Sequence, residues 1–119
     1  MVTSRSGESS ESWIGGAFLF SGRPDPTWPV DEQVAGKLLA IWEGLEPWPG
    51  ELPARPSLGY RGCFLRNDIG QEWFAYRGSV VLQMAEGSQS RSDPGRSFEK
   101  QLLASAPEGT LPGNLIRDD

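Results

Sequence analysis

Apolar residues occur in short, separated runs along this chain of 119 residues, and the first run predicts a strand. The run from Trp13 to Phe20 reads WIGGAFLF, which is too short for a helix and is interrupted by two glycines. We therefore expect a buried central strand here. The pair Gly15 and Gly16 indicates either a bulge or the close approach of another backbone or a ligand.

The next apolar residues are spaced as on one face of a helix. They come after Asp31 and are separated from one another by four, three, one and three residues: Val34, Leu38, Ile41, Trp42 and Leu45. Asp31 is suited to cap the first turn, Glu32 suits the positive end of the helix dipole, and Gly44 or the prolines after it end the helix. We expect the apolar face of this helix to cover a sheet.

Strand patterns return in the second half of the chain. The runs YRGCFLR (60–66), EWFAYR (72–77) and SVVLQM (79–84) are separated by the turn sequence NDIG (67–70) and by Gly78. Such turn chemistry is typical of hairpins, so we expect antiparallel pairing.

Alternation within residues 72–77 places Trp73 and Ala75 on one face of the sheet and Phe74 and Tyr76 on the other. Both faces of this region are therefore partly apolar, and two short helices would leave part of one face uncovered. One hypothesis is purely structural: the chain is a subunit whose apolar sheet face completes a homo-oligomer.

The last expected element is a short helix after the polar, loop-like residues 86–95. Its start is indicated by Ser92 or Asp93 as the cap and by Pro94 in the first turn. The helix ends before Pro107, and its apolar stripe consists of Phe98, Leu102 and Leu103.

These elements predict an α+β fold with a small, mostly antiparallel sheet of about four strands and two helices, in the order β-α-β-β-β-α. We expect residues 1–12 to be a disordered lead-in and residues 13–119 to form a single domain. Residues 46–59 contain four prolines and are expected to form a long Pro/Trp-rich loop, which is uncommon in a compact domain unless it serves a function.

The charge of the chain limits its partners. A net charge of -5 opposes the attraction that drives binding to a phosphate backbone, so we expect no nucleic acid partner. Arg61, Arg66 and Arg77 nevertheless make the middle of the chain mildly basic.

Cysteine content and hydropathy indicate a cytoplasmic protein. Cys63 is the single cysteine, so no intramolecular disulfide is possible. The longest uncharged stretch, residues 12–22, has 11 residues, whereas a membrane span needs about 20. The polar first residues lack the apolar core of a secretory signal.

Several kinds of catalytic and metal chemistry are excluded by composition. The chain has no histidine and one cysteine, which excludes histidine-based nucleophile systems and the usual zinc sites. No phosphate-binding glycine motif is present. We therefore expect no metal and no cofactor, and we favour a non-catalytic protein over an enzyme. The alternative is a small ligand-binding protein or enzyme that uses Asp25 or Glu72 with an arginine, in a pocket over the sheet where burial raises the pKa of the carboxylate.

The segment SGRPDPTWP (21–29) is the first half of the candidate binding surface. Its three prolines have fixed φ, and Arg23, Asp25 and Trp28 each precede a proline and are restricted too. Such a segment loses little entropy on folding or on binding. It is either a connector that clamps the first strand to the helix, which is the commoner role of such a loop, or one wall of a groove.

The leading functional hypothesis is a small, acidic, soluble, non-catalytic binding or accessory protein. It would bind a protein or peptide partner through a rigid surface rich in proline, tryptophan and arginine, since tryptophan, tyrosine and arginine are enriched at binding hot spots. The candidate binding residues are Arg23, Asp25, Trp28, Trp48, Tyr60 and Arg61.

Overall fold

The computed structural model describes residues 12–19, 25–54 and 60–111, so Arg23 and almost all of the expected lead-in lie outside the described residues. Described elements follow in the order β2 (Trp13–Ala17), β3 (Thr27–Pro29), α1 (Glu32–Glu43), β4 (Cys63–Asn67), β5 (Glu72–Tyr76), β6 (Ser79–Met84), β7 (Gly87–Ser92), a short 3-10 helix η2 (Pro94–Arg96) and α2 (Ser97–Ala104).

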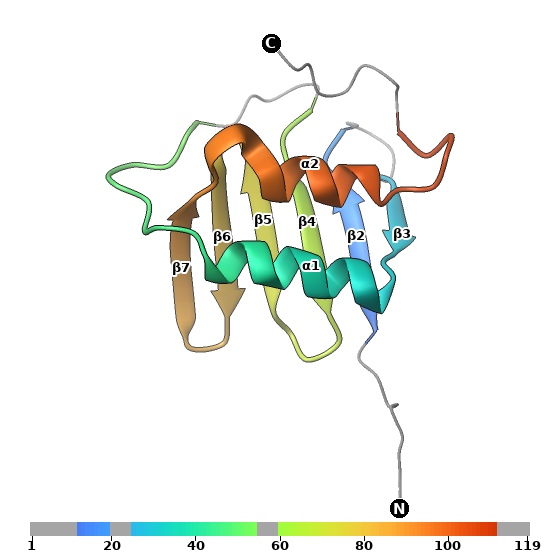
Figure 1. Cartoon of the computed structure of the whole chain (residues 1–119), viewed down its shortest axis with the longest axis horizontal. Helices are drawn as coiled ribbons and strands as arrows, with labels where there is room; N and C mark the ends of the chain where they lie inside the picture. The colour runs from blue at the N-terminus through green and yellow to red at the C-terminus, as the bar shows by residue number, and fades with distance from the viewer. Residues whose placement is uncertain (1–11, 20–24, 55–59, 112–119) are drawn as a thin grey trace, which may run out of the picture.

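The strands form one sheet in the order β3-β2-β4-β5-β6-β7, and every neighbouring pair is antiparallel. Both helices lie across the same face of this sheet (Figure 1). An α+β fold with an antiparallel sheet and two helices is thus confirmed. The expected number of about four strands is wrong, because the sheet has six, and the expected order is wrong because β3 precedes α1 and β7 precedes α2.

Strand β3 was expected to be part of a proline-rich connector. Trp28 instead pairs with Gly15 of β2, and Thr27 and Pro29 pair with the residues on either side. A proline is tolerated here because β3 is an edge strand, where a missing N–H does not interrupt the sheet.

Strand β7 was expected to be a loop because its sequence, GSQSRS, is entirely polar. It pairs along its whole length with β6. Its outer edge is partly covered by the start of the Pro/Trp-rich loop, where the Trp48 N–H donates to the Ser90 carbonyl (2.9 Å) and the Ser92 N–H donates to the Glu46 carbonyl (2.7 Å). Position at a solvated edge explains why this strand carries no apolar residue.

Helix α1 forms as its spacing predicts. The Asp31 carboxylate accepts the Gln33 N–H at 3.3 Å, and the helix ends at Gly44. Ala35, Leu38 and Trp42 are its buried residues.

Helix α2 also begins at the expected place, after Pro94 in the 3-10 turn. The buried Asp93 carboxylate accepts the N–H groups of Phe98 (3.0 Å) and Glu99 (3.3 Å). The buried face consists of Phe98, Glu99, Leu102 and Leu103. Within the described residues, neither helix has the length and apolar character needed to cross a membrane.

The glycine pair in β2 permits close approach on both faces of the sheet. A Cβ at Gly15 would lie 2.8 Å from Trp28 Nε1, and a Cβ at Gly16 would lie 2.2 Å from the Phe64 ring. The approaching groups are side chains of this chain, rather than a backbone or a ligand. Trp28 lies on the face covered by the helices, and Phe64 on the opposite face, hereafter the open face.

Candidate functional site

Trp28, a candidate binding residue, belongs to the core. Its side chain is 2% exposed, and its indole N–H donates to the Ser105 hydroxyl at 2.9 Å, next to the end of α2. This geometry joins the edge strand to the helix layer. Its side chain therefore forms no wall of an open groove in this structure.

Asp25 and Arg61 lie together near the end of β2. A carboxylate oxygen of Asp25 is 3.9 Å from Nη2 of Arg61 and accepts the Leu19 N–H at 2.7 Å. Arg61 is further held because its backbone N–H donates to the Phe18 carbonyl. This pair thus ties the segment before β3 to the segment before β4.

Trp48 lies at the other edge of the sheet. Its indole N–H donates to the Glu51 carbonyl at 2.9 Å, and its backbone pairs with β7. Tyr60 instead points toward α2, where its hydroxyl donates to the Glu99 carboxylate. The described candidate residues are therefore divided among the core, both edges of the sheet and the start of α2, and only Asp25 and Arg61 are brought together.

The open face carries a hollow of about 440 Å³ over β5 and β6. Its apolar lining consists of Phe18, Leu52, Pro53, Phe74, Tyr76 and Val81. Its polar lining consists of Glu72, Ser79 and Gln83. Because Leu52 and Pro53 belong to the Pro/Trp-rich loop, that loop forms one wall of the hollow.

The floor of the hollow is continuous with an aromatic cluster. The ring centroids of Phe18 lie 5.2 Å from Phe64 and 5.8 Å from Phe74, distances at which tilted rings attract each other. The Arg66 guanidinium lies 4.5 Å from the centroid of the Phe64 ring and forms an ion pair with Glu72, Nε to Oε1, at 3.3 Å. An arginine and a carboxylate therefore stand at one end of an apolar surface.

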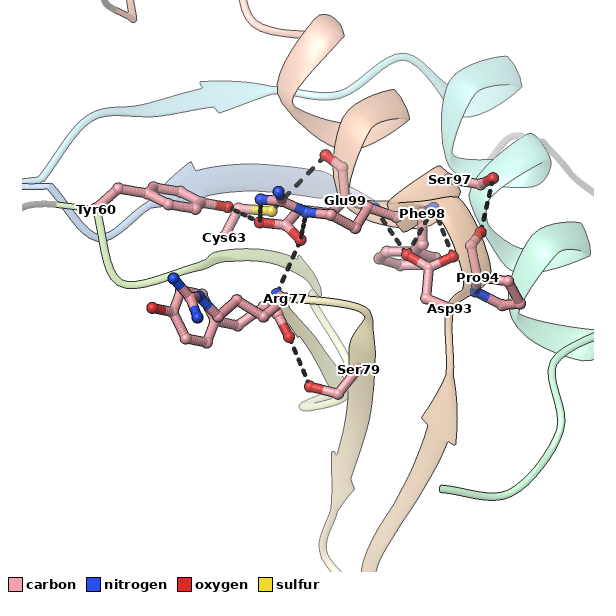
Figure 2. Close-up of polar contacts among 11 residues, drawn as sticks. Tyr60, Cys63, Arg77, Ser79, Asp93, Pro94, Ser97, Phe98 and Glu99 are labelled. Carbon is pink, nitrogen blue, oxygen red and sulfur yellow. Dashed lines mark hydrogen bonds and ion pairs between the residues drawn. The ribbon is translucent and has the colours of Figure 1, made fainter. Parts of the chain in front are cut away.

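Glu99 is the centre of a second cluster, at the end of the sheet where β5 turns into β6 (Figure 2). Its side chain is fully buried. The carboxylate accepts the Tyr60 hydroxyl, the Arg77 backbone N–H (3.1 Å), and Nε and Nη2 of Arg96 (3.1 and 3.2 Å). These donors satisfy the hydrogen-bonding capacity of a buried carboxylate.

Burial also sets the acid-base properties around Glu99. Burial, followed by the nearby Glu99 carboxylate, raises the pKa of the Cys63 thiol well above its ordinary value. Burial is also the main cause that raises the pKa of the Tyr60 hydroxyl. Cys63 has no exposed surface, and a thiol in this state is not a nucleophile.

The two arginines around Glu99 have unusual backbones. Arg77 has φ = 52° and Arg96 has φ = 59°, and both values lie in the left-handed region that non-glycine residues rarely adopt. Such strain persists only where the surroundings impose it. Here the Glu99 carboxylate accepts the backbone N–H of Arg77 and the guanidinium N–H groups of Arg96. A single side chain therefore restrains both arginines.

Glu99 was missed among the candidate residues chosen from the sequence, whereas Glu72, considered there as a carboxylate in a pocket over the sheet, lines the hollow. One signal for Glu99 was present, because it lies beside Phe98 and three and four residues before Leu102 and Leu103, which places it in the apolar stripe of α2. The loop residues that line the hollow, Leu52 and Pro53, gave no comparable signal, since their approach to the sheet depends on the path of residues 46–54.

The two carboxylates considered for catalysis do not converge. Asp25 bonds to Leu19, beyond the end of β2, whereas Glu72 pairs with Arg66, which is in register with Ile14 near the start of that strand. They thus lie at opposite ends of the sheet. In the described ranges, no group of three or more cysteine, aspartate or glutamate residues is arranged to hold a metal ion.

No family model, curated protein or solved structure matches the chain.

Proposed function

We propose that the protein is a small, non-catalytic binding protein that holds a peptide segment of a partner protein in the hollow on the open face of its sheet. The hollow itself is the observation that carries this proposal: it brings the exposed Leu52 and the half-buried Phe18 and Phe74 together in a concave surface. Concave apolar surfaces with a few polar groups are the usual form of binding sites.

In this proposal the Pro/Trp-rich loop supplies part of the binding surface. Leu52 is 45% exposed although it is a large apolar residue, and it stands at the wall of the hollow beside Pro53. Trp48 anchors this loop through its bond to Glu51 and its pairing with β7. A wall restrained in this way loses less entropy when a partner binds.

Peptide selection tests the proposal. Random heptapeptides displayed on phage are selected on the immobilised full chain, and the affinities of the enriched peptides are measured by fluorescence anisotropy. Leu52→Ser removes an apolar contact from the wall and should weaken binding by about 5-fold or more. Ile69→Ser is the matched control, because Ile69 is 65% exposed in the β4–β5 turn and does not line the hollow.

Three results would contradict the proposal. The first is that no peptide sequence is enriched, and the second is that enriched peptides bind the Leu52→Ser and Ile69→Ser chains equally well. A dimer of the wild-type chain that sedimentation equilibrium detects, and that Leu52→Ser dissociates, would also overturn it, because the open face would then be an interface between two copies.

A second candidate function is the binding of a small molecule in the same hollow. Its volume of about 440 Å³ falls in the range of small-molecule sites, and Glu72 with Arg66 supplies both a hydrogen-bond acceptor and a donor at its edge. Screening a fragment set by ligand-observed NMR tests this candidate. Fragments whose signals respond to the wild-type chain but not to a Glu72→Gln chain would support it, and an absence of such fragments would remove it.

A further inference from the structure

We infer that Arg77 recognises an acidic side chain of the bound peptide, so that the partner segment carries an aspartate or glutamate at the Tyr76 end of the hollow. This inference rests on the proposed function and adds the chemistry and the orientation of the partner. Tyr76 lines the hollow, and the Arg77 guanidinium lies 5.7 Å from the centroid of the Tyr76 ring.

The turn that holds Arg77 does not explain why an arginine is present. Tyr76 pairs with Ser79, so Arg77 and Gly78 form a two-residue hairpin loop, and both have positive φ (52° and 84°). Hairpin loops with this geometry favour asparagine, aspartate or glycine at the first position. An arginine at this position lowers the stability of the turn. We attribute its presence to a binding role of the guanidinium.

The guanidinium of Arg77 is also left available. Arg77 is exposed, and within the described part of the chain no carboxylate pairs with its side chain. Glu99 accepts its backbone N–H only, while the Arg96 side chain takes the ionic contact with that carboxylate. Figure 2 shows the Arg77 side chain extending away from Glu99, below Tyr60.

The Glu72 end of the hollow carries a carboxylate that is paired with Arg66, whereas the Tyr76 end is followed by the Arg77 guanidinium, and this difference gives the bound segment a direction. Glu72 lines the hollow at the start of β5, and Arg77 follows the last residue of that strand. An extended peptide advances about 3.4 Å per residue, so a segment of about five residues matches β5. The net charge of -5 disfavours a generally acidic partner, so we expect one acidic residue at the end of a mainly apolar segment.

The test uses Arg77→Asn, which removes the guanidinium and installs a residue that this turn prefers. Its thermal midpoint should equal or exceed that of the wild-type chain, so loss of the fold would not obscure the result. Peptides selected on the wild-type chain should contain an acidic residue at one end. Replacing it with its amide should weaken binding to the wild-type chain by about 5- to 10-fold and leave binding to Arg77→Asn unchanged.

The outcomes separate this inference from the function on which it rests. Peptides that lose affinity for Leu52→Ser but bind Arg77→Asn as tightly as wild type would overturn the role of Arg77 and leave the hollow as the binding site. Enriched peptides without an acidic residue would do the same. Failure to enrich any peptide would overturn both proposals.

Discussion

The two faces of the sheet are completed in different ways. On the helix-covered face, Trp28, Leu65 and Phe98 are 2% exposed or less. On the open face, Phe74 is half-buried and Ile14 is 36% exposed, and beyond the strands the hollow is lined by Phe18, Leu52 and Pro53. Both faces carry aromatic side chains, but one is packed against two helices of the same chain and the other retains apolar surface in a concave site.

This difference indicates that the stability of the fold and the proposed binding depend on different side chains. Side chains that contact the helices contribute to the free energy of unfolding, because their removal leaves a cavity. Side chains around the hollow have solvent on one side and lose less when they are truncated. Substitutions on the two faces should therefore separate folding from binding.

The largest effect is expected for Trp28→Ala on the helix-covered face. It should lower the free energy of unfolding by about 3–5 kcal/mol, because it removes a buried indole together with its hydrogen bond to Ser105. Leu52→Ala on the open face should change it by at most about 0.5 kcal/mol. Urea unfolding followed by circular dichroism measures both values, and equal losses would contradict the division between the faces.

The sequence allowed the helix-covered face to be predicted better than the open one. Helical spacing from Val34 to Leu45 located α1, and strict alternation placed Trp73 and Phe74 on opposite faces of β5. Periodicity of this kind arises where one side of a helix or strand is buried along its whole length, so it predicts contacts between whole elements. It does not specify which loop approaches the other face.

The missed features have a common physical cause. Strand β3 has three residues, which is too short for an alternating pattern to be visible. Trp28 is buried because β3 pairs with β2 at Gly15, and this pairing joins residues that are not neighbours in sequence. The polar sequence of β7 reflects its place at an edge. The hollow depends on the course of Leu52 and Pro53, which no local pattern determines.

A smaller effect is expected at Glu99, whose carboxylate lies at the end of the sheet where β5 turns into β6. Glu99→Gln should lower the free energy of unfolding by about 2–3 kcal/mol, since it removes the ion pair with Arg96 and one of the acceptor oxygens in a buried site. The Arg96 side chain is 32% exposed and can regain water, which keeps the loss below that of a fully buried pair. Urea unfolding measures it.

Glu86→Gln is the matched control for Glu99, because Glu86 is an exposed glutamate in the turn between β6 and β7. It should leave the free energy of unfolding within about 0.5 kcal/mol of wild type. If Glu99→Gln behaved like this control, Glu99 would not be what holds Arg77 and Arg96 in their left-handed conformations.

The smallest effect concerns pH and again separates buried from exposed groups. The unfolded chain loses the Cys63 proton near the ordinary pKa of 9.0, whereas burial keeps the folded thiol protonated to a much higher pH. Above pH 9 the unfolded state therefore binds fewer protons, and the free energy of unfolding falls as pH rises, by at most about 1.4 kcal/mol per pH unit for this group. Cys63→Ala should reduce the slope in urea titrations between pH 8 and 10.5. An unchanged slope would show that the thiol ionises as readily in the folded chain as in the unfolded one, and that the sheet end around Glu99 is open to water.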